Sequence, residues 1–185
     1  LNEEQKSKAK EKFSSGKNYF VYAGAIHPRK NTARLFAAFD EFKKQTVSDM
    51  KLIIAGRKAW STDETMKVFE KMKFKSDVIF LGHLERNELA EVIAASTAMV
   101  YVSLFEGFGI PILEAMNCDV PVITSKTSSM PEVAGNAALF VNPESEKEIV
   151  SAMKVIAEDK NCRDELIHAA REQRKNFSWL QTGNR

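Results

Sequence analysis

The chain has 185 residues, of which 44% are hydrophobic and 28% are charged, and its formal net charge is +2. This length favours a single domain with a proper core, and the small positive excess argues against nucleic acid as a partner. Only two cysteines and three widely separated histidines are present. We therefore expect no disulfide framework and no metal site, and we expect a reducing compartment, the cytoplasm.

The amino-terminal stretch, residues 1–17, is polar and predicts a helix that stops at Gly16. It carries no secretory signal, and it begins with Leu1 instead of Met. The longest apolar run, 92–105, is too short to cross a bilayer. We interpret the chain as a piece of a longer protein.

Six short apolar runs follow, and each is continuous instead of alternating with polar residues. Continuous runs are typical of strands that are buried on both faces of a parallel sheet. The expected strands are 19–23, 51–55, 78–81, 98–102, 121–124 and 137–141.

Amphipathic stretches separate these runs and carry apolar residues at helical spacing. In the first of them, Leu35, Phe36 and Phe39 begin the apolar stripe, and Asn31 is the expected N-cap. The alternation predicts an α/β fold, Rossmann-like, with three layers (α/β/α) and a six-stranded parallel sheet. The expected helices are 32–44, 64–73, 85–95, 112–116, 145–158 and 161–176.

Ligands bind at the carboxyl ends of the strands in such a sheet, so the segments after each strand are the candidate sites. After the first strand, Gly24 begins a turn that brings Arg29 and Lys30 to the start of a helix, where free N–H groups favour an anion. After the second strand, Gly56 is followed by Arg57. These cations form either a phosphate clamp or two solvated basic loops.

The segment after the fourth strand is the most informative. Gly107 and Gly109 permit close approach of the backbone to a ligand, and Pro111 suits the first position of a helix. This combination predicts a diphosphate site at a helix N-terminus. Glu106 and Glu114 bracket the loop, and their carboxylates are suited to accept hydrogen bonds from the paired hydroxyls of a sugar or ribose. In the alternative interpretation, Glu114 is an acid of the first helical turn that the helix dipole stabilises, and Glu106 is an ordinary loop acid.

A hydroxyl-rich segment, 125–133, follows the fifth strand. It is the expected start of a short helix. It either lines a sugar pocket or forms an ordinary capped turn, and the residues themselves are compatible with both.

The segment 106–116, Glu-Gly-Phe-Gly-Ile-Pro-Ile-Leu-Glu-Ala-Met, resembles the Glu-x7-Glu motif of a family of retaining glycosyltransferases with the GT-B fold, the glycosyl transferases group 1. The resemblance covers residues 18–180 and implies that the chain is the C-terminal, donor-binding half of a GT-B enzyme. The other segments that resemble the family, in order along the chain, are 22–24, 28–31, 80–82, 120–125, 130–138 and 177–179.

The resemblance implies a role for each matching residue. Lys30 and Glu106 are implied to be catalytic: Lys30 contacts the donor diphosphate, and Glu106 lies near the transferred sugar. Glu114 holds the ribose hydroxyls, and His83 lies near the base. No metal cofactor is implied, because cationic side chains and the helix end take the charge of the leaving diphosphate. The other residues implied to bind the donor are Gly24, Arg29, Arg57, Gly107, Phe108, Gly109 and Ile110.

One position departs from the family pattern. Many members carry an arginine directly after the glycine of the first loop, and this chain has Ala25 there. We expect Arg29 or Arg57 to supply the missing charge, or the clamp to rest more heavily on Lys30.

A GT-B enzyme has two domains with the active site in the cleft between them. The resemblance therefore implies that residues 1–17 are the approach from a missing N-terminal domain and that 18–185 form the nucleotide-sugar-binding domain. The N-terminal domain is then a partner, and we expect the isolated C-terminal domain to be inactive.

The implied reaction is transfer of a sugar from a nucleoside diphosphate sugar to a glycan or lipid-linked acceptor, with retention of configuration. The Pro-Arg-Lys-Asn sequence at 28–31 is similar to members that use GDP-mannose, and polysaccharide biosynthesis is the expected process. Association of the full-length protein with the inner face of the membrane is a further expectation. Two alternatives stay open: a binding or regulatory domain without catalysis, and a GT-B sugar-nucleotide epimerase.

Overall fold

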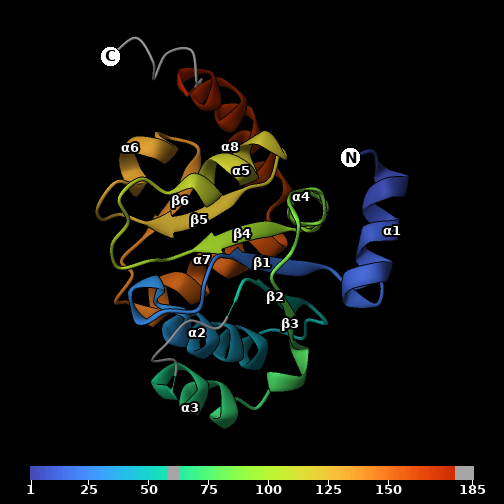
Figure 1. Cartoon of the computed structure of the whole chain (residues 1–185), viewed down its shortest axis with the longest axis vertical. Coiled ribbons are helices and arrows are strands. Elements are labelled where there is room, and N and C mark those ends of the chain that lie inside the picture. Colours follow the sequence, from blue (N-terminus) through green and yellow to red (C-terminus); the bar gives the residue numbers. More distant parts are fainter. Residues whose placement is uncertain (58–62, 178–185) are drawn as a thin grey trace.

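The computed structural model describes residues 1–57 and 63–177. Their strands form one six-stranded sheet in the order β3-β2-β1-β4-β5-β6, and all neighbouring strands are parallel (Figure 1). The predicted Rossmann-like fold is thus confirmed, and every strand begins and ends within one residue of its predicted range. The strands are β1 Tyr19–Ala23, β2 Lys51–Ala55, β3 Val78–Gly82, β4 Ala98–Tyr101, β5 Val122–Ser125 and β6 Ala138–Val141.

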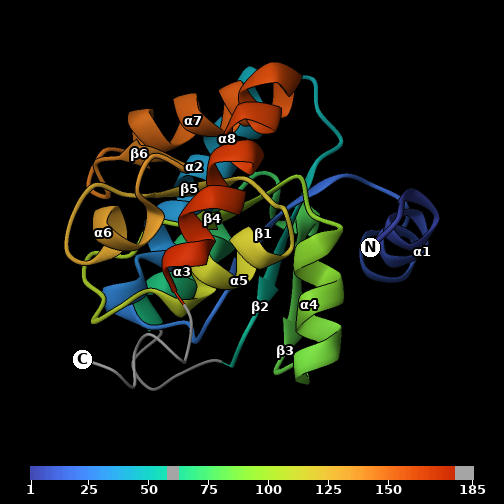
Figure 2. The same ribbon diagram turned by 90° about the horizontal axis from the view of Figure 1, so that it is seen from above.

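Helices cover both faces of the sheet (Figures 1 and 2). On one face α2 packs against α3 and α7, and on the other lie α4, α5 and α6, with α8 packed against α5. The helices are α1 Glu3–Ser14, α2 Thr32–Gln45, α3 Asp63–Lys71, α4 Arg86–Ala94, α5 Ile110–Asn117, α6 Met130–Ala134, α7 Glu146–Glu158 and α8 Lys160–Gln173, with 3-10 turns η1 Pro28–Lys30, η2 Lys75–Asp77 and η3 Arg174–Asn176.

The helix predicted at 112–116 begins two residues earlier, at Ile110. Pro111 then occupies its first turn, where the missing N–H of proline costs no hydrogen bond. The earlier start matters because it brings the helix N-terminus directly onto the glycine loop.

Burial explains the continuous apolar runs. All five residues of the central strand β1 are buried, whereas the edge strands β3 and β6 are only partly buried. Aromatic rings fill the layer between the sheet and α2, where the ring of Phe36 lies 5.6 Å from that of Phe69 and 6.0 Å from that of Phe80. Such ring pairs add to the burial of apolar area, which is the main stabilising contribution of this core.

The first helix, α1, lies apart from the sheet and packs against α4 (Figure 1). Lys12 of α1 forms ion pairs with Glu88 (3.5 Å) and Glu91 (3.2 Å) of α4. The helix ends before Gly16, whose φ is 75°, so the predicted stop is confirmed. The role of residues 1–17 as the approach from another domain stays a prediction.

The apolar run 92–105 becomes the end of α4, strand β4 and the start of a loop. In the described ranges, 1–57 and 63–177, no helix has the length and apolar character that crossing a membrane requires.

Candidate functional site

Two loops meet at the centre of the sheet, where the strand order changes direction. β1 and β4 are neighbours, but the chain leaves β1 towards β2 and leaves β4 towards β5 on the other side. The loop after β1 and the loop after β4 are tied together by a hydrogen bond from the Leu104 N–H to the Arg29 carbonyl (2.9 Å). This point of an open α/β sheet is where ligands bind.

Asn31 strengthens the connection between the two loops. Its side-chain amide donates hydrogen bonds to the carbonyls of Val102 (2.9 Å) and Pro143 (2.7 Å). Asn31 occupies the N-cap position of α2, as predicted, but its side chain makes no capping bond. Its side-chain oxygen instead accepts a hydrogen bond from the Arg34 guanidinium (2.8 Å). Its backbone has a left-handed φ of 59°, a conformation that Asn adopts more readily than most residues. Asn31 thereby fixes the position of the preceding residue, Lys30.

The structure brings together the two residues that the resemblance implied to be catalytic. Lys30 Nζ lies 2.6 Å from Glu106 Oε1, and the two side chains are only 15% and 7% exposed. Lys30 Nζ also donates a hydrogen bond to the hydroxyl of Tyr101 (2.8 Å) and lies 5.1 Å from the centre of its ring. Burial alone would raise the pKa of the Glu106 carboxyl, but the hydrogen bond and charge of Lys30 help to hold this pKa below its usual value. Glu106 is therefore ionised at neutral pH.

The glycine loop after β4 rests on hydroxyl groups from the segment after β5. The Ser128 hydroxyl donates to the Glu106 carbonyl (2.6 Å) and accepts from the Glu106 N–H (3.2 Å). The Ser129 hydroxyl lies 3.0 Å from the Glu106 carbonyl and 2.8 Å from that of Phe108. Ser129 lies at the N-cap position of α6 but makes no side-chain capping bond, so these serine hydroxyls serve the glycine loop instead of the helix start.

The backbone of the glycine loop keeps unpaired hydrogen-bond donors. Across the described part of the chain, no acceptor receives a hydrogen bond from the N–H groups of Gly107, Phe108, Gly109 or Ile110. Gly109 has a left-handed φ of 104° and directly precedes α5, so the positive end of the helix dipole adds to these N–H groups. Unpaired N–H groups at a helix N-terminus are suited to bind phosphate oxygens.

The turn after β2 presses against the turn after β1. The Gly24 N–H donates to the Ala55 carbonyl (2.8 Å), and the Ile26 N–H donates to the Arg57 carbonyl (2.9 Å). A Cβ on Gly56 would lie 1.8 Å from the Gly24 carbonyl oxygen, so only glycine fits there. Arg57 is thereby held beside the first loop.

Glu114 lies one turn into α5, half-buried, and its carboxylate forms no hydrogen bond or ion pair with any described residue. Burial raises the pKa of this carboxyl, and the positive charge of Arg86 opposes the increase without cancelling it. Arg86 begins α4, and His83 lies three residues earlier, in the loop after β3. The His83 side chain is exposed and is not hydrogen-bonded to any described residue, so the structure does not join it to Lys30 and Glu106.

The remaining predicted residues lie at the surface of the same edge. The side chains of Arg29 and Arg57 are exposed and form no ion pair within residues 1–57 and 63–177. Phe108 and Ile110 are exposed apolar residues of the glycine loop. The Phe108 ring packs edge-on against Phe177, with 5.8 Å between ring centres. Phe177 begins the Phe-Ser-Trp match, and the other two residues of that match, 178–179, lie outside the described residues.

Sequence reasoning missed Tyr101 and the support from Ser128 and Ser129. Tyr101 is the last residue of β4 and reads as one more buried strand residue, since it is 1% exposed. The available signal was its position directly before the glycine loop, because a polar side-chain tip at the end of a strand reaches the carboxyl edge of the sheet.

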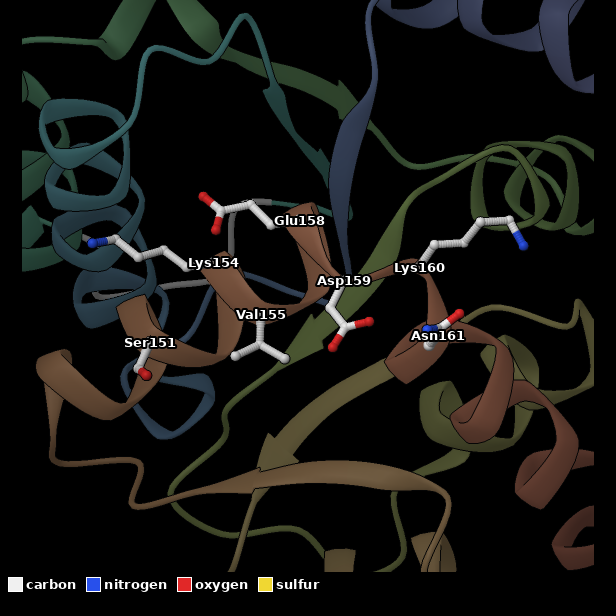
Figure 3. Close-up of a pocket in the computed structure, with 7 residues that line it drawn as sticks. All are labelled: Ser151, Lys154, Val155, Glu158, Asp159, Lys160 and Asn161. Atoms are coloured by element: carbon white, nitrogen blue, oxygen red, sulfur yellow. The ribbon is translucent and has the colours of Figure 1, made fainter.

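A surface hollow lies far from these loops, at the junction of α7 and α8 (Figure 3). It is lined by Ser151, Lys154, Val155 and Glu158 of α7, by Asp159 between the helices, and by Lys160 and Asn161 of α8. Figure 3 shows that the two lysines point away from each other, and Lys160 is paired with Asp164 (2.5 Å). The hollow therefore lacks the convergent polar groups of a ligand site.

The fold and the site together define a Rossmann-like domain whose switch point holds a lysine–glutamate pair and N–H groups that no described residue accepts from. In the part of the chain that the structure describes, no three His, Cys, Asp or Glu side chains are grouped to hold a metal ion. The family model for glycosyl transferases group 1 matches residues 3–173, and the chain belongs to that family.

Known relatives and solved structures agree with this assignment. The chain is 34% identical over 161 residues to O-antigen chain mannosyltransferase B of Escherichia coli, which covers 87% of this chain and 42% of that protein. It is 39% identical over 140 residues to O-antigen chain mannosyltransferase RfbU of Salmonella typhimurium, covering 75% of this chain and 38% of that protein. The chain thus spans less than half the length of these relatives.

Among solved structures, the Anabaena protein Alr3699/HepE in complex with UDP-glucose has a TM-score of 0.84 at 19% identity, covering 95% of this chain and 49% of that chain. The C-terminal domain of a glycosyl transferase group 1 family protein (LpcC) from Francisella tularensis has a TM-score of 0.80 at 23% identity, covering 95% of this chain and 92% of that chain. The fold is therefore that of the C-terminal Rossmann-like domain of GT-B glycosyltransferases, as predicted.

Proposed function

We propose that this chain is the donor-binding half of a retaining glycosyltransferase that transfers mannose from GDP-mannose to a glycan or lipid-linked acceptor. The observation that carries the proposal is the part-buried Lys30–Glu106 pair beside the N–H groups of the glycine loop, which have no acceptor among the described residues. Cations and free N–H groups at the switch point suit a diphosphate, and a carboxylate beside them suits a sugar.

Lys30 contacts the donor diphosphate in this proposal. An ammonium group has three hydrogens, and Lys30 gives one to Glu106 and one to Tyr101. The third is not used by any described residue, so a phosphate oxygen can be bound without breaking the ion pair. As the bond to the sugar breaks, negative charge grows on the diphosphate, and a cation held in place stabilises that charge most effectively.

The two glutamates have separate roles. Glu106 keeps its negative charge next to Lys30, and this carboxylate faces the positive charge that develops on the sugar ring. Glu114, which lacks a partner among the described residues, accepts hydrogen bonds from the ribose hydroxyls. His83 lies at the side of the base.

Arg57 replaces the arginine that is absent at Ala25. Its carbonyl is bonded to the N–H of Ile26, the residue directly after Ala25. The backbone of Arg57 is therefore held at the turn that contains Ala25, and its guanidinium is exposed there. The backbone of Arg29 is held against the loop after β4 instead. With Lys30, the loop N–H groups and these arginines, the donor is bound without a metal ion.

The relatives support the choice of sugar and process. Two of them are O-antigen chain mannosyltransferases, so we propose GDP-mannose as the donor and polysaccharide biosynthesis as the process. An N-terminal domain completes the active site, the isolated half is inactive, and the complete protein works in the cytoplasm at the inner face of the membrane.

The test is turnover by the complete protein with GDP-mannose, UDP-glucose and ADP-glucose. We expect GDP to be released only with GDP-mannose, and an acceptor glycan to gain a mannose whose anomeric proton in NMR matches that of the donor. Inverted configuration would contradict retention. Binding without turnover would favour the regulatory alternative, and conversion of the donor without transfer would favour the epimerase.

A further inference from the structure

Tyr101 has an unusual set of contacts for a buried strand residue. Its hydroxyl accepts a hydrogen bond from Lys30 Nζ at 2.8 Å, and its ring centre lies 5.1 Å from the same nitrogen. Lys30 therefore meets both the polar tip and the ring of one side chain. The Glu106 carboxylate approaches the same ammonium group at 2.6 Å.

The ring of Tyr101 is held in place by its surroundings. It stacks on Tyr22 with 6.3 Å between ring centres, and both residues are 1% exposed or less. The Tyr22 hydroxyl donates to the Ala25 carbonyl (2.9 Å), so the second ring of the stack is anchored to the first loop. A close-packed ring leaves the Tyr101 hydroxyl at one fixed position.

We propose that Tyr101 is a positioning residue: its hydroxyl and the Glu106 carboxylate fix two of the three ammonium hydrogens of Lys30, and the third is thereby aimed at the donor diphosphate. This inference rests on the proposed function of Lys30. A lysine side chain has four rotatable bonds and much rotamer entropy, so a lysine fixed by one partner would lose more entropy on binding the ligand. Two fixed partners remove that cost before the ligand arrives.

The competing explanation is that Lys30 merely satisfies a buried hydroxyl. Tyr19 offers a matched control for it, because its hydroxyl is also buried and donates to the Val92 carbonyl (2.7 Å), away from Lys30. Tyr101→Phe and Tyr19→Phe each remove one buried hydroxyl and keep the ring. If Tyr101 had only a structural role, the two variants would affect ligand binding equally.

The experiment titrates GDP into this chain by calorimetry and records the thermal midpoint of each variant. We expect Tyr101→Phe to weaken GDP binding about tenfold, the size of one hydrogen bond to a charged group, and Tyr19→Phe to leave it unchanged. In the Lys30→Ala background, Tyr101→Phe should cause no further loss, because its effect passes through Lys30.

Four outcomes would overturn the positioning role, two of them while the proposed function stands. Equal GDP affinities of Tyr101→Phe and Tyr19→Phe would do so, as would a full additional loss when Tyr101→Phe is combined with Lys30→Ala. In both cases Lys30→Ala alone still weakens binding, so the proposed function stands. If Lys30→Ala leaves GDP binding unchanged, or if the chain does not bind GDP, the diphosphate clamp itself is wrong and the role of Tyr101 is lost with it.

Discussion

A lysine paired with a carboxylate lies near each end of helix α2: Lys30 in the turn before it and Lys43 in its last turn. The two pairs differ in one respect. Lys43, in the last turn of α2, is 4% exposed and lies 2.8 Å from Asp77 and 3.1 Å from the Met50 carbonyl, with a further bond to the Ser48 carbonyl. All three of its ammonium hydrogens are used. Lys30, before the first turn of α2, uses two with partners among the described residues.

This difference separates a structural ion pair from a site. Lys43 lies at the amino edge of the sheet, where Asp77 is also paired with Lys51 (2.5 Å) at the start of β2. Lys43, Asp77 and Lys51 each have a fixed partner, and the pairs connect α2 to the start of β2 and to the turn η2 before β3. At the carboxyl edge, Lys30, Glu114 and the loop N–H groups keep unused hydrogen-bonding capacity among the described residues. A cluster that leaves such capacity is prepared for a ligand.

The largest expected effect is on stability at the amino edge. Asp77→Asn leaves Lys43 and Lys51 without their shared carboxylate, so we expect the free energy of unfolding to fall by about 3 kcal/mol, the lower end for a broken buried pair. The lower end applies because Asp77 is still 17% exposed. Urea unfolding measures the change. GDP affinity should not change, and Asp164→Asn, which breaks an exposed pair with Lys160, should cost less than about 1 kcal/mol.

The next effect is on catalysis at the carboxyl edge. Lys30→Ala in the complete enzyme should lower the turnover rate about 10²–10³-fold, as the loss of one preorganised donor does elsewhere. The rate of GDP release from GDP-mannose measures it at saturating donor. Lys44→Ala removes a half-exposed cation in the last turn of α2, away from the glycine loop, and as the control it should keep most of the activity. Undiminished turnover by Lys30→Ala would contradict the role of the lysine.

Glu114 should give GDP binding a pH dependence. Its pKa is raised by burial, so the carboxylate is present above this raised value and is lost as the pH falls through it. Affinity for GDP should therefore decrease as the pH falls, beginning above the usual titration range of Glu. The stability of the free chain should change with pH in the opposite direction. Protonation removes the cost of burying the charge, so the contribution of Glu114 to stability rises as the pH falls through the same window.

Calorimetry at a series of pH values tests this prediction with Glu114→Gln as the control. The variant should bind GDP about tenfold more weakly at neutral pH, because a bond to a charged acceptor becomes a bond to a neutral one. It should also lose the part of the pH dependence that is not due to the phosphate groups. Identical pH profiles for the variant and the original chain would count against a ribose contact.

The smallest effect concerns the support of the glycine loop. Phe177→Ala removes the edge-on contact with Phe108, a type of contact worth about 1 kcal/mol beyond its buried area. We expect GDP binding to weaken by about fivefold or less, because the loop N–H groups become less well fixed. Phe177→Leu keeps part of the packing, so its GDP affinity should lie between those of Phe177→Ala and the original chain. A larger loss than for Lys30→Ala would mean that the loop, and not the lysine, dominates binding.

The sequence predicted most of the fold because its signals are local. Continuous apolar runs marked all six strands, and the amphipathic stretches between them marked the helices. The segments after the first and fourth strands were also predicted to lie at the carboxyl edge of the sheet. The structure has Lys30, Glu106 and Glu114 in these segments. The start of α5 was placed two residues late, because Ile110 and Pro111 are equally compatible with a loop.

The contacts that organise the site could not be read from the sequence. Asn31 was expected to cap α2, but its side chain bonds to carbonyls 71 and 112 residues away. Tyr101 and Lys30 are also 71 residues apart, so their hydrogen bond depends on the register of β4 beside β1. Such contacts follow from strand order, which local patterns do not encode.

The most direct test of the account is calorimetric titration of this chain with GDP, UDP and ADP, repeated with Lys30→Ala, Glu114→Ala and Asp77→Asn. The account predicts micromolar-to-millimolar binding of GDP in preference to the other two. It further predicts that both carboxyl-edge changes weaken this binding and that Asp77→Asn does not. Binding that is weakened by Asp77→Asn but not by Lys30→Ala, or no binding of any nucleoside diphosphate, would contradict the assignment of the carboxyl edge as the donor site.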